Sequence, residues 1–485
     1  MSKTVLTRRA LLAAERPRVT VGSGRPVALL FPNRYPVAMS SLGYQSLWAR
    51  LATIEGVAVE RVVVDTPFAP GVPPASHERP VSLETGRPLS DFDLIAVSIS
   101  DESDLANLAV TLAAAGLSPL AAERPATAPP VLAGGPLAAS NPRPLGAFAD
   151  AVLCGDSEGL LVPLIETALA AGDRGALAEA LMSEPTLADC GALYLPEQDG
   201  DDAPAPRVVG SDSLPAAARV WTPHSALAEM FLVEASRGCS RGCTFCAGGR
   251  ACGGERRAPA ARVLARIPAE APRVGFVGAA VSDHPELKAM LAQVVARGRG
   301  VGVSSVRADR LDDELVRLLV AGGARTLTVA ADALSERLRG RIRKGITAAQ
   351  LEHAAVLAAR HKIKTLKLYA LVGLPGERED ELQEFLDLCA VLRREVRLVV
   401  ALNPFVPKRL TVLADEPMAD QKTLRRRIER LSRGLRQSGV ELRALSPRWA
   451  FVQWRLSQGG RGSGSAVWQA IQAGGRYADW RRALG

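Results

Sequence analysis

Short apolar segments alternate with helical segments over the second half of this chain, and this alternation restricts its fold more than any other feature. The apolar segments with strand character are residues 230–233, 273–278, 300–306, 326–331, 365–373 and 397–402. Repeated strand–helix units predict parallel strands with helices outside them, and six units imply a partial (β/α)6 barrel of the TIM type. The active site of such a barrel lies at the carboxyl ends of its strands.

Three cysteines directly follow the first of these strands. Cys239, Cys243 and Cys246 are spaced C-x3-C-x2-C. Thiolates bind soft metal centres, and an iron–sulfur cube takes one thiolate for each iron. Three clustered thiolates therefore leave one iron of a [4Fe-4S] cluster with an open coordination position, where chemistry takes place. The spacing predicts that these cysteines are metal ligands at the carboxyl edge of the barrel.

A structural zinc site is the alternative interpretation of the same segment. Cys252 follows six residues after Cys246 and would complete a tetrahedron of thiolates. The chain would then be a non-catalytic metal-binding scaffold. Zinc sites usually consist of two C-x2-C pairs far apart in the sequence, whereas these cysteines lie in one compact loop. The role of Cys252 stays open, and we do not assign it as a cluster ligand.

The first part of the chain also alternates strand and helix signals. Apolar strand segments lie at residues 27–31, 59–64, 94–99, 130–135 and 151–155. This alternation predicts a Rossmann-like, doubly wound parallel sheet, and such sheets bind ligands at the carboxyl ends of their strands. Glycines there let the backbone approach a bulky ligand. The candidate ligand-binding residues in these loops are Asn33, Ser98, Gly134 and Gly135.

Polar and proline-rich segments mark the expected domain boundaries. We expect a Rossmann-like domain, a linker, the barrel, and a small C-terminal α/β extension, over residues 1–175, 176–228, 229–405 and 406–485. Within the extension, the glycines and serines of residues 459–465 predict a flexible loop.

Composition and charge restrict the location and the partners. Seven cysteines, an odd number, in 485 residues without a secretory leader indicate a reducing compartment. No apolar run reaches the roughly 18 residues of a membrane span, so we expect a cytoplasmic protein. The net charge is +9, and the densest basic run, from Arg425 to Arg436, recurs at helical spacing. A solvated helix face is the favoured interpretation, and nucleic-acid binding is the less favoured one.

The cysteine segment resembles the signature of the radical S-adenosylmethionine (radical SAM) superfamily, in which an aromatic residue precedes the third cysteine. Phe245 fills that position. Segments after the later barrel strands also resemble the family, and residues 371–377 match its G-L-P-G-E turn. Asp332 departs from the glutamate that relatives more often carry. The resemblance implies that SAM is bound by Gly278, Ala279, Ser305, Arg307, Asp332, Gly373 and Pro375.

The first part of the chain resembles the cobalamin-binding-type domain of one large branch of this superfamily. Residues 31–43 are similar to the Y-P-N-x-Y-x-V-x-M-S-x-L-G opening of an uncharacterised group in that branch, and residues 402–408 to its N-P-F-x-P-K segment. The resemblance implies cobalamin near Asn33, Ser98, Gly134 and Gly135. The D-x-H-x-x-G signature is missing, so a corrin here would lack that histidine ligand. The alternative is a domain that serves only interdomain packing.

The resemblance also implies an activity. A reduced cluster, supplied with an electron by a donor such as flavodoxin or ferredoxin, cleaves SAM to methionine and a 5'-deoxyadenosyl radical, which takes hydrogen from the substrate. With cobalamin present, methyl transfer to an unactivated carbon is the expected reaction. A cobalamin-free modification of RNA, peptide or lipid is the alternative, and the substrate itself is not predicted.

Overall fold

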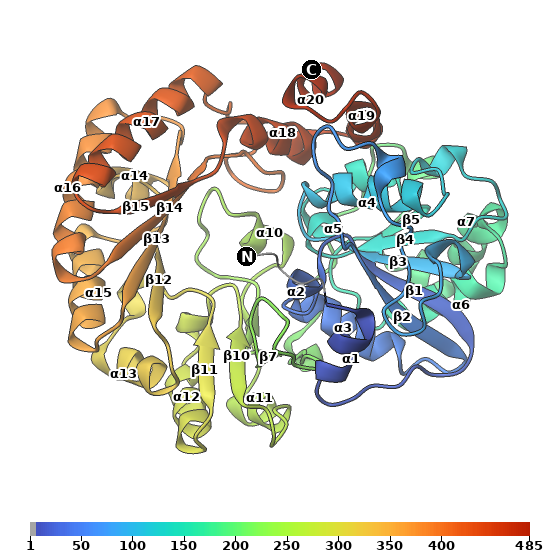
Figure 1. Ribbon diagram of the computed structural model, residues 1–485, viewed down its shortest axis with the longest axis horizontal. Helices are drawn as coiled ribbons and strands as arrows, with labels where there is room; N and C mark the ends of the chain where they lie inside the picture. Colours follow the sequence, from blue (N-terminus) through green and yellow to red (C-terminus); the bar gives the residue numbers. More distant parts are fainter. Residues whose placement is uncertain (1–5) are drawn as a thin grey trace. The chain divides into compact units, whose positions relative to one another are not determined.

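The structure is a computed structural model that describes residues 6–485, and its chain forms two compact units (Figure 1). The first unit runs to Glu229 and also contains Arg455–Gly485, whereas the second unit is Met230–Trp454. The boundary at residue 229 lies where we expected the barrel to begin. The other division between the units falls within helix α18, Pro447–Gln458.

The first unit is built on a six-stranded sheet with the order β2-β1-β3-β4-β5-β6. Its strands are β1 Arg25–Phe31, β2 Val57–Val63, β3 Leu94–Ser98, β4 Val131–Gly134, β5 Ala151–Leu153 and β6 Leu193–Tyr194. The first five are parallel, and β6 pairs antiparallel with β5. The predicted doubly wound sheet is therefore confirmed. Strand β6 lies in the expected linker and was not predicted, because two residues are too short to show a period-two pattern.

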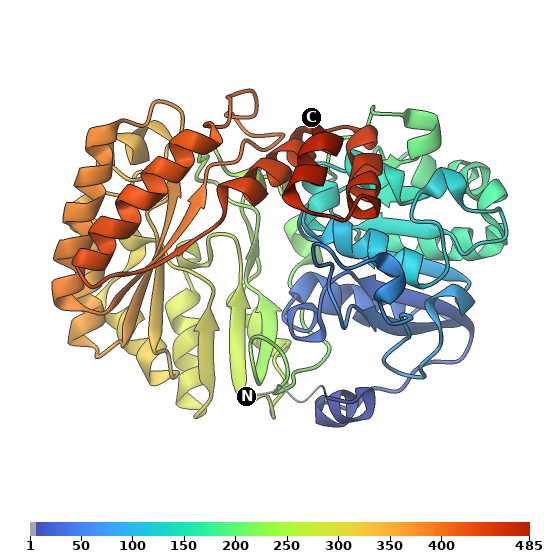
Figure 2. The same ribbon diagram turned by 45° about the horizontal axis from the view of Figure 1, so that its top comes forward.

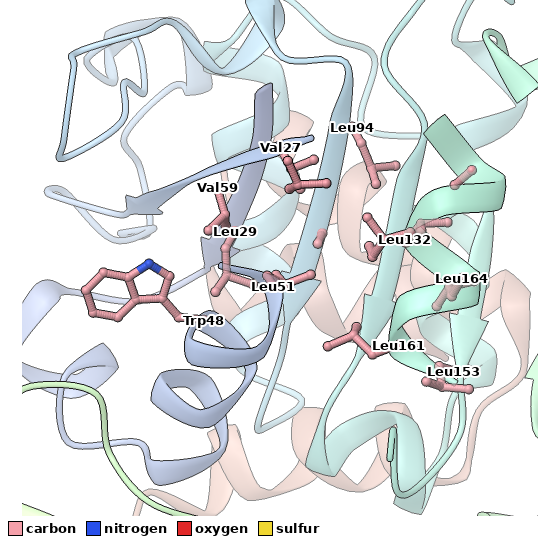
Figure 3. Packing of buried hydrophobic residues seen from close by; sticks show 14 of the residues in the cluster. Val27, Leu29, Trp48, Leu51, Val59, Leu94, Leu132, Leu153, Leu161 and Leu164 are labelled. Carbon is pink, nitrogen blue, oxygen red and sulfur yellow. The ribbon is translucent and has the colours of Figure 1, made fainter. Parts of the chain in front are cut away.

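Helices pack on both faces of this sheet, as right-handed crossovers require. Helices α3 Leu42–Leu51, α6 Leu161–Ala171 and α7 Arg174–Ser183 contribute to one apolar core with the strands. Figure 3 shows Val27, Leu29 and Val59 of the strands beside Leu51 and Trp48 of α3. Successive residues of β1 alternate between the two faces, and Val27 to Phe31 are all buried, as expected for a strand with helices on both sides.

The C-terminal helices α19, Arg461–Gln472, and α20, Tyr477–Leu484, complete the first unit. The predicted flexible loop at residues 459–465 is wrong, because α19 begins within it. A Cβ atom at Gly464 would lie 2.1 Å from the Pro144 carbonyl oxygen, so this glycine allows α19 to pack closely on the 3-10 helix Arg143–Ala147. Buried Asn141 also donates to the Gly459 carbonyl at 2.9 Å. The glycines provide close packing here rather than flexibility.

The second unit contains seven parallel strands in two sheets, which together form the predicted partial barrel (Figure 1). The first sheet has β7 Met230–Glu234, β10 Arg273–Val277 and β11 Gly300–Val303. The second sheet has β12 Thr326–Ala330, β13 Thr365–Val372, β14 Leu398–Pro404 and β15 Glu441–Ala444. A single parallel bridge between Val306 and Val329 links the two sheets. All six expected strands are present, and β15 of the expected extension adds a seventh.

Helices cover the outer side of these strands. They are α11 Ala260–Ala265, α12 Leu287–Ala296, α13 Asp313–Ala321, α14 Glu336–Arg341, α15 Ala348–Arg360, α16 Glu379–Glu395 and α17 Gln421–Gln437. Figure 2 shows the basic helix α17 beside α16 on the outside of the second sheet. Its apolar residues Leu424, Leu431 and Leu435 are buried, and its cationic residues are largely exposed, as a solvated helix face requires. Of the helices described in residues 6–485, none combines the length and apolar character that a membrane span requires.

Candidate functional site

The cysteine segment forms a hairpin loop at the carboxyl end of β7. Two short antiparallel strands, β8 Ser236–Arg237 and β9 Arg256–Arg257, close the loop at its base. Gly238 has φ +75°, and a Cβ atom there would lie 2.4 Å from the Gly254 oxygen, so only glycine fits where the two sides of the loop meet. The loop then carries Cys239, Cys243 and Cys246 as half-buried free thiols, and helix α10, Ala247–Ala251, follows at once.

The type and the number of the candidate ligands fit an iron–sulfur cube. Cys239, Cys243 and Cys246 are free thiols on one loop, and three thiolates are what a cube with one open iron needs. Across residues 6–485, however, no three or more His, Cys, Asp or Glu side chains are gathered into a group placed to hold a metal ion. Ligation by these three cysteines therefore stays a prediction. Cys252 is half-buried at the end of α10, and its role also stays open.

Arg241 ties the cysteine loop to the carboxyl ends of the next two strands. Its guanidinium donates to both carboxylate oxygens of Asp283, at 2.8 and 2.5 Å, and lies 3.6 Å from Asp309. The hydrogen bond to Asp283 is the main reason why the pKa of Arg241 is raised. Asp283 also accepts from Arg310 at 2.9 Å. These bidentate, charge-assisted contacts hold the loop between the second and third strands of the barrel.

Two of the predicted SAM-binding residues, Arg307 and Asp332, lie next to Cys243. Arg307 is buried and donates to Asp309 at 2.9 and 3.1 Å and to the Lys344 carbonyl oxygen at 3.0 Å. The Lys344 ammonium is 2.5 Å from the Asp332 carboxylate. Burial raises the pKa of the Cys243 thiol, whereas the charges of Lys344 and Arg307 act in the opposite direction. Asp332 and Cys246 act in the same direction as burial, so the pKa of this thiol is raised on balance, and Lys344 and Arg307 offset part of that increase.

Lys344 lies beside these predicted site residues, but it was not itself predicted from the sequence. Its segment contacts the cysteine loop directly, because the Cys243 thiol donates to the Arg343 carbonyl oxygen at 3.6 Å. Asp332, its partner, has φ +61°, a conformation that aspartate tolerates better than most residues. The backbone N–H of Asp332 donates to the Tyr369 carbonyl oxygen at 3.1 Å and fixes this turn to β13.

Gly373 and Pro375 lie in the turn that follows β13. Gly373 has φ +85°, and its backbone N–H donates to both carboxylate oxygens of Glu377 at 3.0 Å. Arg427 of α17 contacts the same carboxylate at 2.8 Å. Burial raises the pKa of Glu377 to about 7, against the opposing effects of the Gly373 amide and Arg427. Glu377 therefore connects the turn to the helix outside it, and it was not singled out as a site residue.

A small apolar cluster joins three of these segments. Phe245 of the cysteine loop packs against a buried cluster that contains Leu374 of the Gly373 turn and Ala333 beside Asp332. The backbone N–H of Thr244 also donates to the Ile342 carbonyl oxygen at 3.0 Å. The cysteine loop, the Asp332 segment and the Gly373 turn thus form one site, although they come from distant parts of the sequence.

The remaining predicted SAM-binding residues lie at the ends of β10 and β11. Gly278 is required by close packing, since a Cβ atom there would lie 2.5 Å from the Ser236 hydroxyl oxygen. Ala279 is exposed, and Ser305 is half-buried between β11 and the 3-10 helix Ala308–Arg310. These residues lie in loops at the carboxyl edge, and their contact with SAM stays a prediction.

The predicted cobalamin-binding residues lie together at the carboxyl edge of the first unit's sheet. Asn33 follows β1, and Ser98 ends β3, its neighbour, at the point where the strand order reverses. The Asn33 amide donates to the Asp104 carboxylate at 2.9 Å. Gly135 has φ +104°, and a Cβ atom there would lie 2.6 Å from the Ile99 oxygen. The glycine is therefore needed by the backbone itself, whether or not a corrin binds.

Asp104→Asn should flatten the pH dependence of stability in the first unit. Burial raises the pKa of Asp104 to about 6, so the folded state binds this proton more tightly than the unfolded state. Stability from this group is present at low pH and is lost as the pH rises from about 4 to about 6, by up to about 3 kcal/mol. Urea denaturation of both proteins between pH 4 and pH 7.5 tests this. Parallel curves for the wild type and the variant would contradict the assignment.

Comparison with known proteins agrees with this arrangement. The sequence family described as "Radical SAM proteins, N-terminal" matches residues 43–196, and the family described as "Radical SAM superfamily" matches residues 233–389. The chain belongs to the radical SAM superfamily and carries this N-terminal domain, so it is a radical SAM enzyme.

Two individual proteins are similar to the chain. The uncharacterized protein MJ0966 of Methanocaldococcus jannaschii is 26% identical over 426 residues, which cover 86% of this chain and 84% of that protein. The structure titled cobalamin-dependent S-adenosylmethionine radical enzyme OxsB, with aqua-cobalamin and S-adenosylmethionine bound, matches with a TM-score of 0.50 at 13% identity. That match covers 86% of this chain and 56% of the OxsB chain, so this chain spans little more than half of it. The likeness to OxsB shows the fold.

Proposed function

We propose that this radical SAM enzyme holds a [4Fe-4S] cluster on Cys239, Cys243 and Cys246 and cleaves SAM reductively there. This proposal depends on the hairpin loop that carries three free thiols at the carboxyl end of β7. Arg241 fixes the loop, and Arg307 and Lys344 lie beside it. The cluster would supply one electron, which an external one-electron donor provides. The carbon–sulfur bond of the sulfonium breaks, and the products are methionine and a 5'-deoxyadenosyl radical.

The surrounding residues position the SAM molecule in this proposal. The turn at Gly373 and Pro375 offers backbone against the adenine, and Arg307 lies where the ribose and carboxylate are expected. The pair of Lys344 and Asp332 adds one cationic and one anionic group beside Cys243. Phe245 packs against the cluster that contains Leu374, which connects this turn to the cysteine loop. The protein contributes position and charge, and the cofactor contributes the reactivity.

Methyl transfer to an unactivated carbon is the reaction we propose. It requires cobalamin as methyl carrier in the first unit, where Asn33, Ser98, Gly134 and Gly135 line the edge at which doubly wound sheets bind ligands. The aqua-cobalamin bound in the OxsB structure supports this proposal. Asn33 is held by Asp104 at that edge. In each turnover one SAM, with one electron from the donor, would yield the 5'-deoxyadenosyl radical, which takes a hydrogen atom from the substrate and becomes 5'-deoxyadenosine. A second SAM would supply the methyl group through the corrin and leave as S-adenosylhomocysteine, and a second electron from the same donor would return the corrin to the state that accepts a methyl group.

Anaerobic purification followed by metal and corrin analysis tests the proposal. We expect four iron and four sulfide per chain after reconstitution, a copurifying corrin, and consumption of two SAM molecules per turnover. Formation of 5'-deoxyadenosine without a corrin would favour the cobalamin-free modification of RNA, peptide or lipid. Stoichiometric zinc without SAM cleavage would overturn the proposal and favour a metal-binding scaffold.

A further inference from the structure

The central strand of the second sheet, β13, has two different faces. Leu366, Leu368 and Ala370 are buried, and strand β13 contacts the outer helices α15 and α17. Lys367 and Tyr369 alternate with them and are half-buried, so they lie on the opposite, inner face. Leu371, the next residue on that face, packs against the cluster that contains Phe245. The inner face of β13 therefore leads along the strand to the cysteine loop.

Lys367 differs from Lys344 and Arg307 in having no carboxylate partner among residues 6–485. Its ammonium is 3.2 Å from the Tyr369 hydroxyl and 4.8 Å from the centre of the Tyr369 ring. No ion pair of Lys367 is present among residues 6–485, whereas Lys344 is paired with Asp332 and Arg307 with Asp309. A half-buried ammonium without a counter-ion is unfavourable unless an anion or water completes its surroundings.

The neighbouring strands place a threonine and two alanines beside this pair. On β12, Thr328 lies beside Lys367, and Ala330 lies beside Tyr369. On β14, Ala401 lies beside Tyr369. Parallel partners in register share a face, so two short side chains, Ala330 and Ala401, flank the phenol ring. Thr328 places a third donor, a hydroxyl, next to the ammonium and the phenol.

We propose that Lys367 and Tyr369, with Thr328, form an oxyanion-binding site for a carboxylate or phosphate group of the substrate. Ammonium and hydroxyl donors bind either group, and the charge-assisted hydrogen bonds are the stronger ones. Tyr369 lies two residues from Leu371, about 7 Å along the strand, so the anion would be anchored beneath the cysteine loop. The inference rests on the proposed function, because it takes the inner face of the barrel as the substrate side.

Titration of the full-length chain with inorganic phosphate, followed by 31P NMR line broadening, tests this site. Lys367→Gln should weaken phosphate binding at least about 10-fold, as expected from the loss of a hydrogen bond to a charged group. The matched control is Lys364→Gln, at an exposed lysine three residues earlier, which should bind phosphate like the wild type. Lys367→Arg keeps the charge and should retain binding within about 3-fold.

Competition by acetate distinguishes a site for carboxylates from a site for phosphates. Displacement of phosphate by equimolar acetate would indicate a carboxylate site, and resistance to acetate would indicate a phosphate site. Equal phosphate affinity of the wild type and Lys367→Gln, or no measurable affinity of the wild type, would overturn the inference. The formation of 5'-deoxyadenosine by the wild type is measured separately, so failure of the proposed function is distinguishable from failure of this site.

Discussion

Cys243→Ala is expected to reduce the reductive cleavage of SAM to background. The cube would lose one of its three protein ligands, and the remaining two thiolates would not retain a cluster with an open iron facing SAM. The variant should also lose most of its iron and sulfide after anaerobic reconstitution. Both losses are measured directly, by metal and sulfide analysis and by quantifying 5'-deoxyadenosine with a chemical reductant in excess.

Cys252→Ala is the matched control for this experiment. Cys252 is a half-buried cysteine of the same loop, and it lies outside the C-x3-C-x2-C spacing. This variant should retain its cluster and cleave SAM. Equal loss of iron and activity in both variants would show that Cys252 is a ligand and that our assignment of three ligands is wrong.

Gly373→Ala is expected to weaken SAM binding at least about 10-fold, which is the second largest effect. At φ +85° an L-residue costs about 1–2 kcal/mol. A Cβ atom at this position would also lie 2.6 Å from the Leu424 side chain and 3.1 Å from that of Ala419, so the Leu424 side chain, the turn or helix α17 must shift. Either movement disturbs the Gly373 amide that Glu377 holds. Equilibrium binding of SAM to the reconstituted protein gives the change in dissociation constant.

Gly323→Ala provides the control for backbone strain alone. Gly323 has φ +89°, and nothing lies within 4 Å of a Cβ atom there. Both variants should lose a similar amount of stability from the unfavourable φ, but only Gly373→Ala should lose SAM affinity. Similar SAM affinities in the two variants would contradict a role of the Gly373 turn in binding.

The barrel and the cysteine loop were predictable because their signals are local. Each predicted barrel strand is an apolar run that is followed along the chain by a loop and a helix, and the three cysteines lie within eight residues of one another. The family resemblance added the later segments in order. The pairing of Lys344 with Asp332 was not predictable in this way, because twelve residues and a helix separate them and only the fold brings them together.

The wrong loop prediction at residues 459–465 and the missed strand β6 have the same explanation, because only the fold brings the contacting segments together. Gly464 belongs to a glycine–serine segment that predicts a loop, yet its glycine serves close packing of α19 on residues 143–147. That contact is with a segment more than 300 residues away in the sequence. Strand β6 is recognisable only by its pairing with β5. Tertiary contacts determine these elements, and the local composition carries no signal for them.

The most direct test of the account is to reduce the anaerobically reconstituted wild-type protein with SAM present and to quantify methionine and 5'-deoxyadenosine. We predict equimolar formation of both products, together with an electron paramagnetic resonance signal of the reduced cluster that changes when SAM is added. A protein that carries four iron and four sulfide per chain but forms neither product would contradict the central claim that this loop presents an open iron to SAM.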